Sequence, residues 1–142
     1  MRKTALVTGM HTSLAYLVAE KLIKDGNMRV IAPVRVRESD RVDALIRNYG
    51  ENVIVSDFSP LDFQEAKELV AAADYILNLD FVGMPESEHF PDFAEKVNYF
   101  YTKNFVDAVI ETGSDAKIIE LSTTGIYGGR TMKRPYAAVG HP

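Results

Sequence analysis

The stretch that decides the fold is Lys3–Ala15, which reads KTALVTGMHTSLA. A short apolar run at Ala5–Val7 stops at Thr8 and Gly9, and a helical pattern of apolar residues begins within a few positions. This order is typical of a first strand that turns tightly into a first helix, where open α/β sheets hold a phosphate-bearing ligand. The N–H groups at the start of such a helix lack intrahelical partners and carry partial positive charge, so they attract an anion.

The glycine pattern of this turn is incomplete. The Gly-x-x-Gly-x-x-Gly spacing falls on Gly9, Thr12 and Ala15, so only its first position is glycine. Ala15 is a mild change, because small size is what lets the helix pack on the strand. Thr12 places a Cβ atom and a hydroxyl where the backbone should approach a phosphate. Two interpretations stay open: a nucleotide site, or an ordinary strand–helix turn with Thr12 or Ser13 as N-cap.

Apolar runs and helical patterns alternate along the chain. We expect strands near residues 5–7, 30–34, 53–55, 75–79 and 118–121, with helices between them. The strands are continuous apolar runs, which favours a parallel sheet covered on both faces. Right-handed crossovers favour the strand order 3-2-1-4-5 and a ligand crevice at the C-terminal ends of the strands. The predicted fold class is α/β: a Rossmann-type doubly wound parallel sheet in three layers, α/β/α, ending after the fifth strand.

Turn residues predict where individual elements begin and end. Pro33 is expected at the C-terminal end of the second strand, because a central strand loses a ladder hydrogen bond at proline. Pro60 is expected in the first turn of the third helix, where proline is tolerated. The longest helix is expected at about 92–111 and ended by Gly113. The segment 80–91 is expected to be a surface loop.

The composition excludes several classes of function. A length of 142 residues suits one domain, 1–142, and a formal net charge of −4 gives no reason to expect nucleic acid or an anionic membrane as partner. The absence of cysteine excludes disulfides and thiolate metal sites, and the three histidines show no ligand spacing. No apolar run approaches the roughly 18 residues of a membrane span, and no signal-peptide core is present, so we expect a cytoplasmic protein.

Nearly the whole chain resembles, in order and spacing, the N-terminal part of the extended short-chain dehydrogenase/reductase family. That family includes the nucleotide-sugar epimerases, or NAD-dependent epimerase/dehydratases, and dihydroflavonol-reductase-like enzymes. The most specific match is Leu121–Gly128, LSTTGIYG, which is similar to the family's Ser-Ser-x-x-x-Tyr-Gly segment. The other matches are Thr8-Gly9 with Ala15, Arg35 after the second strand, Asp57-Phe58 after the third strand, and Asn98 in the long helix.

The resemblance implies a dinucleotide cofactor. NAD-preferring sites place a carboxylate after the second strand to accept from the ribose 2′-OH, whereas an arginine suits a 2′-phosphate. Family reductases with arginine at the position of Arg35 are typically NADP-dependent, so NADP is expected in preference to NAD. The alternative is that Arg35, Arg37 and Arg41 form a solvated basic rim.

The resemblance also implies roles for other residues. Asp57 matches the aspartate that accepts from the adenine amino group, with Phe58 beside the ring, and Asn98 matches an asparagine that steadies the sheet near the active site. The alternatives are a helix-capping turn at Asp57 and a solvent-facing Asn98. The expected cofactor-binding residues are Gly9, His11, Thr12, Ser13, Leu14, Arg35, Asp57, Phe58, Leu79 and Asn98.

The end of the fourth strand departs from the family pattern. Small residues usually lie there against the cofactor, but this chain has Leu79, Asp80 and Phe81. A carboxylate close to a pyrophosphate is repulsive. Asp80 therefore either points into the crevice and weakens cofactor binding, or caps the loop and faces solvent.

The catalytic set that the resemblance implies is incomplete. Thr123 falls on the Ser/Thr position that polarises the substrate carbonyl. The family's tyrosine is followed four residues later by a lysine that lowers its pKa, since a tyrosine with a pKa of about 10 is a poor proton shuttle at neutral pH. Tyr136 is followed four residues later by Gly140, so we do not assign it as the acid. The domain is expected to be inactive by itself.

Two hypotheses of function remain. The first is the dinucleotide-binding domain of a reductase or epimerase of this family, lacking the substrate domain. The alternative is a non-catalytic Rossmann-like protein that senses nucleotides or forms oligomers. A fifth strand at the edge of the sheet predicts exposed apolar surface there, and hence a homo-oligomer formed through the strand-five side.

Overall fold

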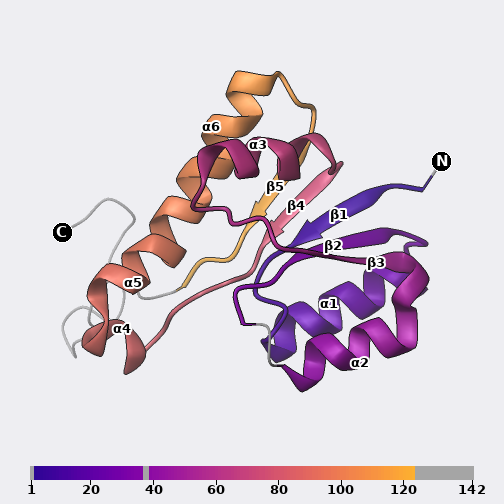
Figure 1. The fold of residues 1–142 in the computed structure, drawn as a ribbon, viewed down its shortest axis with the longest axis horizontal. Coiled ribbons are helices and arrows are strands. Elements are labelled where there is room, and N and C mark those ends of the chain that lie inside the picture. The colour runs from indigo at the N-terminus through magenta and orange to yellow at the C-terminus, as the bar shows by residue number, and fades with distance from the viewer. Residues whose placement is uncertain (1, 37–38, 124–142) are drawn as a thin grey trace, which may run out of the picture.

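A five-stranded parallel sheet forms the centre of the protein, with the strand order β3-β2-β1-β4-β5 (Figure 1). The computed structural model describes residues 2–36 and 39–123. The strands are β1 (Thr4–Val7), β2 (Arg29–Pro33), β3 (Val53–Ser56), β4 (Tyr75–Asn78) and β5 (Lys117–Glu120). The predicted fold class and strand order are confirmed.

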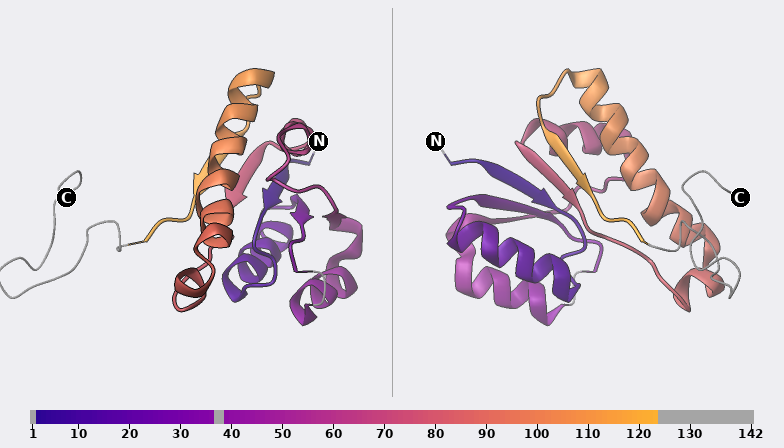
Figure 2. Two further views of the ribbon diagram at one scale, coloured as in Figure 1. Left: turned by 60° about the vertical axis from the view of Figure 1, so that its left-hand side comes forward. Right: turned by 180° about the vertical axis from the view of Figure 1, so that it is seen from behind.

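Helices cover both faces of the sheet, giving the three layers expected of this fold (Figures 1 and 2). One face carries α1 (Ser13–Lys24) and α2 (Asp40–Tyr49), which is followed by the 3-10 turn η1 (Gly50–Asn52). The other face carries α3 (Phe63–Ala71) and a long helical stretch before β5. That stretch comprises α5 (Pro91–Glu95), the π-helical turn η2 (Lys96–Phe100) and α6 (Tyr101–Thr112), with the short α4 (Glu86–His89) ahead of it.

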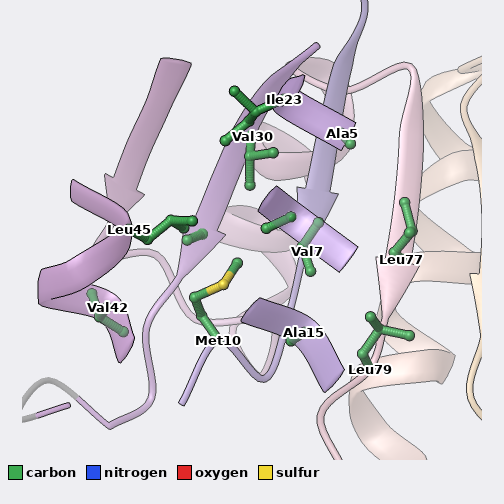
Figure 3. Packing of buried hydrophobic residues seen from close by; sticks show 12 residues of the cluster. Ala5, Val7, Met10, Ala15, Ile23, Val30, Val42, Leu45, Leu77 and Leu79 are labelled. Carbon is green, nitrogen blue, oxygen red and sulfur yellow. The ribbon is translucent and has the colours of Figure 1, made fainter. Parts of the chain in front are cut away.

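The central strand β1 contributes to the core on both faces, because successive side chains of a strand point to opposite sides. Ala5 and Val7 pack in the cluster with α1 and α2, whereas Leu6 packs in the cluster with α3 and α6. Figure 3 shows the first cluster, in which Met10 from the turn after β1 is also buried. The turn that follows β1 is thus anchored in the core by its own side chain.

Several predicted boundaries need correction. The third helix begins at Phe63 rather than at Pro60, because the Asp62 carboxylate accepts from the Glu65 N–H at 3.0 Å and caps it. The segment 80–91 is not only a surface loop, since it contains α4 and since Asp80 is buried. Pro33 does end β2, where it lies opposite Ser56 of β3.

The surface beside β5 is apolar, as the sequence led us to expect. Ile119 is 51% exposed although it belongs to a strand. A groove of about 400 Å³ lies between this strand, β4 and the C-terminal end of α1, lined by Lys3, Leu22, Gly26, Met28, Tyr75, Leu77 and Ile119. Oligomerisation through this side stays a prediction. Within residues 2–36 and 39–123, no helix combines the length and apolar character needed to cross a membrane.

Phe105 provides a test of the core on the α6 face, where its side chain has no exposed surface. Phe105→Ala should lower the free energy of unfolding by about 3–5 kcal/mol, because it removes a buried ring and leaves a cavity. Urea unfolding followed by circular dichroism measures this loss. Phe90→Ala is the matched control, since Phe90 is 61% exposed, and it should cost less than about 0.5 kcal/mol. Equal losses in the two variants would contradict the described packing.

Candidate functional site

The candidate site lies at the C-terminal ends of β1, β2 and β4. Gly9, in the turn after β1, has a φ of +76°, a conformation that favours glycine. A Cβ atom at this position would lie 2.9 Å from both the Cα and the N atom of Asp80, which follows β4. Glycine is therefore required here by its backbone conformation and by the close approach of the two chain segments.

The Thr8 hydroxyl joins the same two segments. It accepts hydrogen bonds from the backbone N–H groups of Leu79, at 2.9 Å, and Asp80, at 3.0 Å. It also donates to the Asn78 Oδ1 atom at 2.7 Å, and both side chains are almost completely buried. One hydroxyl thus satisfies two backbone donors at the point where β4 ends. Sequence reasoning noted Thr8 only as part of a motif and did not predict this role.

Thr12 caps helix α1. Its hydroxyl accepts from the Ala15 N–H at 3.3 Å and donates to the Gly9 carbonyl at 2.7 Å. Thr12 is therefore the N-cap of α1, as one of the two interpretations of the sequence predicted. No acidic side chain lies in the first turn of α1, so within this turn no carboxylate offsets the positive end of the helix dipole.

Arg41 of α2 donates hydrogen bonds to the same turn between β1 and α1. Its Nη1 atom donates to the His11 carbonyl at 3.1 Å, and its Nη2 atom donates to the Ser13 Oγ atom at 2.8 Å. Leu14, in the first turn of α1, is 47% exposed. Arg41 therefore does more than form a solvated rim, because it fixes the loop that precedes α1.

Arg35 and Asp80 form a bidentate ion pair. The Arg35 Nε atom donates to Asp80 Oδ2 at 3.0 Å, and Arg35 Nη2 donates to Asp80 Oδ1 at 2.9 Å. The Asp80 side chain is only 2% exposed and the Arg35 side chain 21%. The guanidinium also lies 4.9 Å from the centre of the Phe93 ring. The interpretation of Asp80 as a solvent-facing loop cap is wrong, since its carboxylate is buried against Arg35.

His11 adjoins this pair. Its Nε2 atom lies 3.3 Å from Arg35 Nη2 and 3.9 Å from Asp80 Oδ1. Burial lowers the pKa of His11 below its usual value, and the positive charge of Arg35 acts in the same direction, against the attraction of Asp80. At neutral pH the imidazole is therefore uncharged, and an unprotonated Nε2 accepts the hydrogen bond from Arg35.

A cavity of about 280 Å³ lies on the other side of Arg35. Three residues predicted to bind the cofactor, Arg35, Asp57 and Phe58, line it together. Tyr101 lines it as well, and burial, assisted by the Asp80 carboxylate, raises the pKa of this phenol to about 12. The remaining lining residues are Pro33, Val34, Ser59, Pro60, Leu61, Phe93 and Val97.

The structure thus separates the predicted site residues into two groups. Arg35, Asp57 and Phe58 share the cavity, whereas the turn and strand-end residues Gly9, His11, Thr12, Ser13, Leu14 and Leu79 do not line it. The Leu79 side chain is buried in the core with α1 and α2. Arg35 connects the two groups, because it lines the cavity and also pairs with Asp80, whose backbone lies against Gly9.

Two asparagines fix loops, one after β4 and one after β3 beside the cavity. Asn98, in the π-helical turn η2, accepts from the Val82 N–H at 2.8 Å and donates to the Val82 carbonyl at 2.9 Å. It therefore does not merely face solvent, because it clamps the chain that leaves β4. Asn104 of α6, which sequence reasoning missed, donates to the Pro60 carbonyl at 2.8 Å and so holds the loop after β3.

The predicted catalytic position lies at the edge of what the structure describes. Thr123 is exposed and follows the end of β5 by three residues. Tyr127, Tyr136 and Gly140 lie outside the described residues, so the incomplete catalytic set stays a prediction. Within residues 2–36 and 39–123, no group of three His, Asp or Glu side chains is arranged to hold a metal ion.

Comparisons with known proteins identify the fold. No family model and no curated protein matches the chain. Among solved structures, a short-chain dehydrogenase from Streptomyces avermitilis is similar at 20% identity and a TM-score of 0.67, over 96% of this chain and 54% of its own. A UDP-glucose 4-epimerase from Bifidobacterium longum, in complex with NAD+ and UDP, is similar at 22% identity and a TM-score of 0.73, over 88% of this chain and 38% of its own.

A second epimerase structure agrees with these two. The UDP-glucose-4-epimerase from Stenotrophomonas maltophila, with bound NAD and formylated UDP-arabinopyranose, is similar at 19% identity and a TM-score of 0.76. That alignment covers 91% of this chain and 39% of the epimerase. The chain therefore shares the fold of a part of each of these enzymes and spans about half of their length or less.

The junction formed by Thr8 can be tested by removing its hydroxyl. Thr8→Val should lower the free energy of unfolding by about 2–4 kcal/mol, because the buried N–H groups of Leu79 and Asp80 lose their acceptor. The free energy is measured by urea unfolding. The control is Thr112→Val, which removes one hydrogen bond to the Ala108 carbonyl at the end of α6 and should cost less than about 1 kcal/mol. A loss at Thr8 no larger than that at Thr112 would refute the role of this hydroxyl.

Proposed function

We propose that this chain is the dinucleotide-binding domain of an extended short-chain dehydrogenase/reductase, of the reductase or NAD-dependent epimerase/dehydratase type. The observation that carries the proposal is the cavity of about 280 Å³ at the C-terminal edge of the sheet, lined by Arg35, Asp57 and Phe58. Ligands of open α/β folds bind at this edge. The proposal is also supported by the shared fold of two epimerase structures that contain NAD.

The residues around the cavity fit the adenosine end of such a cofactor. The cavity is close to the lower limit of about 300 Å³ for small-molecule pockets, which suits half of a dinucleotide rather than the whole. The Asp57 carboxylate would accept a hydrogen bond from the adenine amino group, and the ring of Phe58, a residue that is 43% exposed, would lie against the base. Asn104 would hold the loop after β3 that frames this end of the ligand.

The turn after β1 fits a diphosphate less well. Gly9 allows close approach of backbone, and the N-terminus of α1 carries partial positive charge. Against this, the Asp80 carboxylate is buried beside the turn and is neutralised by Arg35. Two like charges 4 Å apart repel by about 1 kcal/mol in water and about 4 kcal/mol near a protein surface. Whether a diphosphate can bind at this turn therefore depends on how far Arg35 offsets the charge of Asp80.

A bound nicotinamide dinucleotide supplies the hydride chemistry in proteins of this class. The residues of this chain bind and orient its adenosine end, and Thr123 is the residue that we assign to the substrate carbonyl. Neither Tyr127 nor Tyr136 is followed by lysine four residues later. We therefore propose that the 142-residue chain does not catalyse hydride transfer by itself.

We propose a preference for NADP over NAD. Two arginines near the crevice support this preference, since Arg35 lines the cavity and Arg41 binds the loop between β1 and α1. A 2′-phosphate would interact with Arg41 and with the Nη1 atom of Arg35, which takes no part in the bidentate pair with Asp80. The sequence offers no carboxylate to a ribose 2′-OH between β2 and Glu38.

A non-catalytic oligomerising or nucleotide-sensing protein is the second candidate. It is favoured by the buried Arg35–Asp80 pair in the crevice and by the apolar groove beside β5, which contains the half-exposed Ile119. A stable dimer in sedimentation that binds none of the four nicotinamide dinucleotides would support this candidate over the first.

The proposed function is tested by thermal melting of the 142-residue chain with NADPH, NADP, NADH and NAD. A ligand at a hundred times its Kd adds about 2.7 kcal/mol, which raises the Tm of a domain of this size by several degrees. We expect larger shifts with the phosphorylated pair. Asp57→Ala should reduce every shift, whereas Asp115→Ala, an exposed change remote from the cavity, should not.

The possible results separate the two parts of the proposal. Equal shifts with NADP and NAD would contradict the preference and leave dinucleotide binding standing. The absence of a shift with all four ligands, in a protein that melts cooperatively, would contradict dinucleotide binding itself.

A further inference from the structure

A buried carboxylate occupies the position next to the turn where a diphosphate is expected. The Asp80 backbone touches Gly9 so closely that a Cβ atom there would lie 2.9 Å from the Asp80 Cα atom. Its side chain is 2% exposed and accepts two hydrogen bonds from Arg35. The Nε–Nη2 edge of a guanidinium is an edge that binds carboxylates and phosphates bidentately. In Arg35, this edge already binds the Asp80 carboxylate.

The ion pair also divides the crevice. Arg35 lines the cavity that we assign to adenosine, whereas Asp80 does not, and neither do Gly9, His11 or Thr12. Arg35 comes from the end of β2, Gly9 from the end of β1 and Asp80 from the end of β4, so the pair spans the C-terminal end of the central strand. A ligand that extends from the cavity to the turn must pass this pair.

We propose that Asp80 is an internal competitor for the ligand's 5′-diphosphate and thereby determines which part of a nucleotide the domain holds. The inference rests on the proposed nucleotide function and adds to it. In the wild-type protein the cavity holds the adenosine end, and the diphosphate adds little affinity. Arg35 is satisfied by Asp80, and the carboxylate opposes a second anion beside Gly9.

The competition favours the internal carboxylate for a physical reason. Removing Arg35 from Asp80 would leave a buried charge unpaired, which is strongly unfavourable. With Arg35 in place, His11 adds no positive charge at neutral pH, because burial and the charge of Arg35 lower its pKa. The neighbouring Tyr101 phenol also stays protonated, with a pKa raised to about 12. Within the described residues, Arg35 is therefore the cation that neutralises Asp80.

The test compares adenosine, ADP and NAD as ligands, because adenosine and ADP differ only by the diphosphate. Isothermal titration calorimetry on the wild-type chain should give Kd values for adenosine and ADP that agree within about threefold. In Asp80→Asn, the carboxylate charge is removed at nearly constant size and Arg35 can bind the diphosphate. ADP and NAD should then bind at least about tenfold more tightly than in the wild type, while adenosine changes by less than about threefold.

Further variants isolate the cause. The control Asp25→Asn removes a carboxylate that pairs with Lys21 on the surface of α1, and it should behave as the wild type. The double variant Arg35→Met/Asp80→Asn removes both charges, so it should lose the tenfold gain for ADP. If Asp80→Asn does not melt cooperatively, Asp80→Ser replaces it. We expect the same increase in affinity for ADP and NAD from Asp80→Ser.

The outcomes distinguish this inference from the function on which it rests. ADP binding at least about tenfold more tightly than adenosine to the wild type would overturn the inference and leave nucleotide binding intact. An unchanged ratio of the two affinities in a folded Asp80→Asn or Asp80→Ser protein would overturn it as well. If neither adenosine, ADP nor NAD binds to the wild type or to a folded Asp80 variant, the proposed function fails, and the inference fails with it.

Discussion

The backbone leaving β1 at Gly9 lies directly against the backbone leaving β4 at Asp80, and this close approach determines the architecture of the crevice. Glycine is required because a Cβ atom would overlap Asp80 and because the φ of +76° is unfavourable for other residues. The Thr8 hydroxyl secures the same junction by accepting from two buried N–H groups at the end of β4. A junction this tight fixes the Asp80 side chain beside the turn, where only a nearby cation can offset its charge.

That cation is Arg35, and its position couples three strands. The guanidinium comes from the end of β2, reaches across β1 and meets the carboxylate at the end of β4. It is supported by the Phe93 ring at 4.9 Å and by the uncharged His11. The same guanidinium lines the cavity assigned to adenosine. The ion pair therefore joins the ends of β2 and β4, and in our proposal it limits the anions that can enter the crevice.

The sequence predicted the fold well and the site only in part. Strand order followed from apolar runs separated by helical patterns, because a buried parallel sheet leaves little choice of residue or crossover. The start of α3 was misplaced at Pro60, because the Asp62 carboxylate caps the helix two residues later. The π-helical turn within the long helix was not foreseen, because nothing in the spacing of its apolar residues departs clearly from an α-helix.

The sequence by itself determined the strand–turn–helix start, the need for glycine at position 9 and the grouping of Asp57 with Phe58 at the sheet's C-terminal edge. Each is a local property, set by hydrophobic pattern, turn chemistry or position after a strand. Only the tertiary structure decided that Arg35 pairs with Asp80, that Thr8 satisfies the end of β4 and that Asn104 holds the loop after β3. These contacts join residues 44 to 72 positions apart, and such long-range pairs are set by how the helices and strands pack.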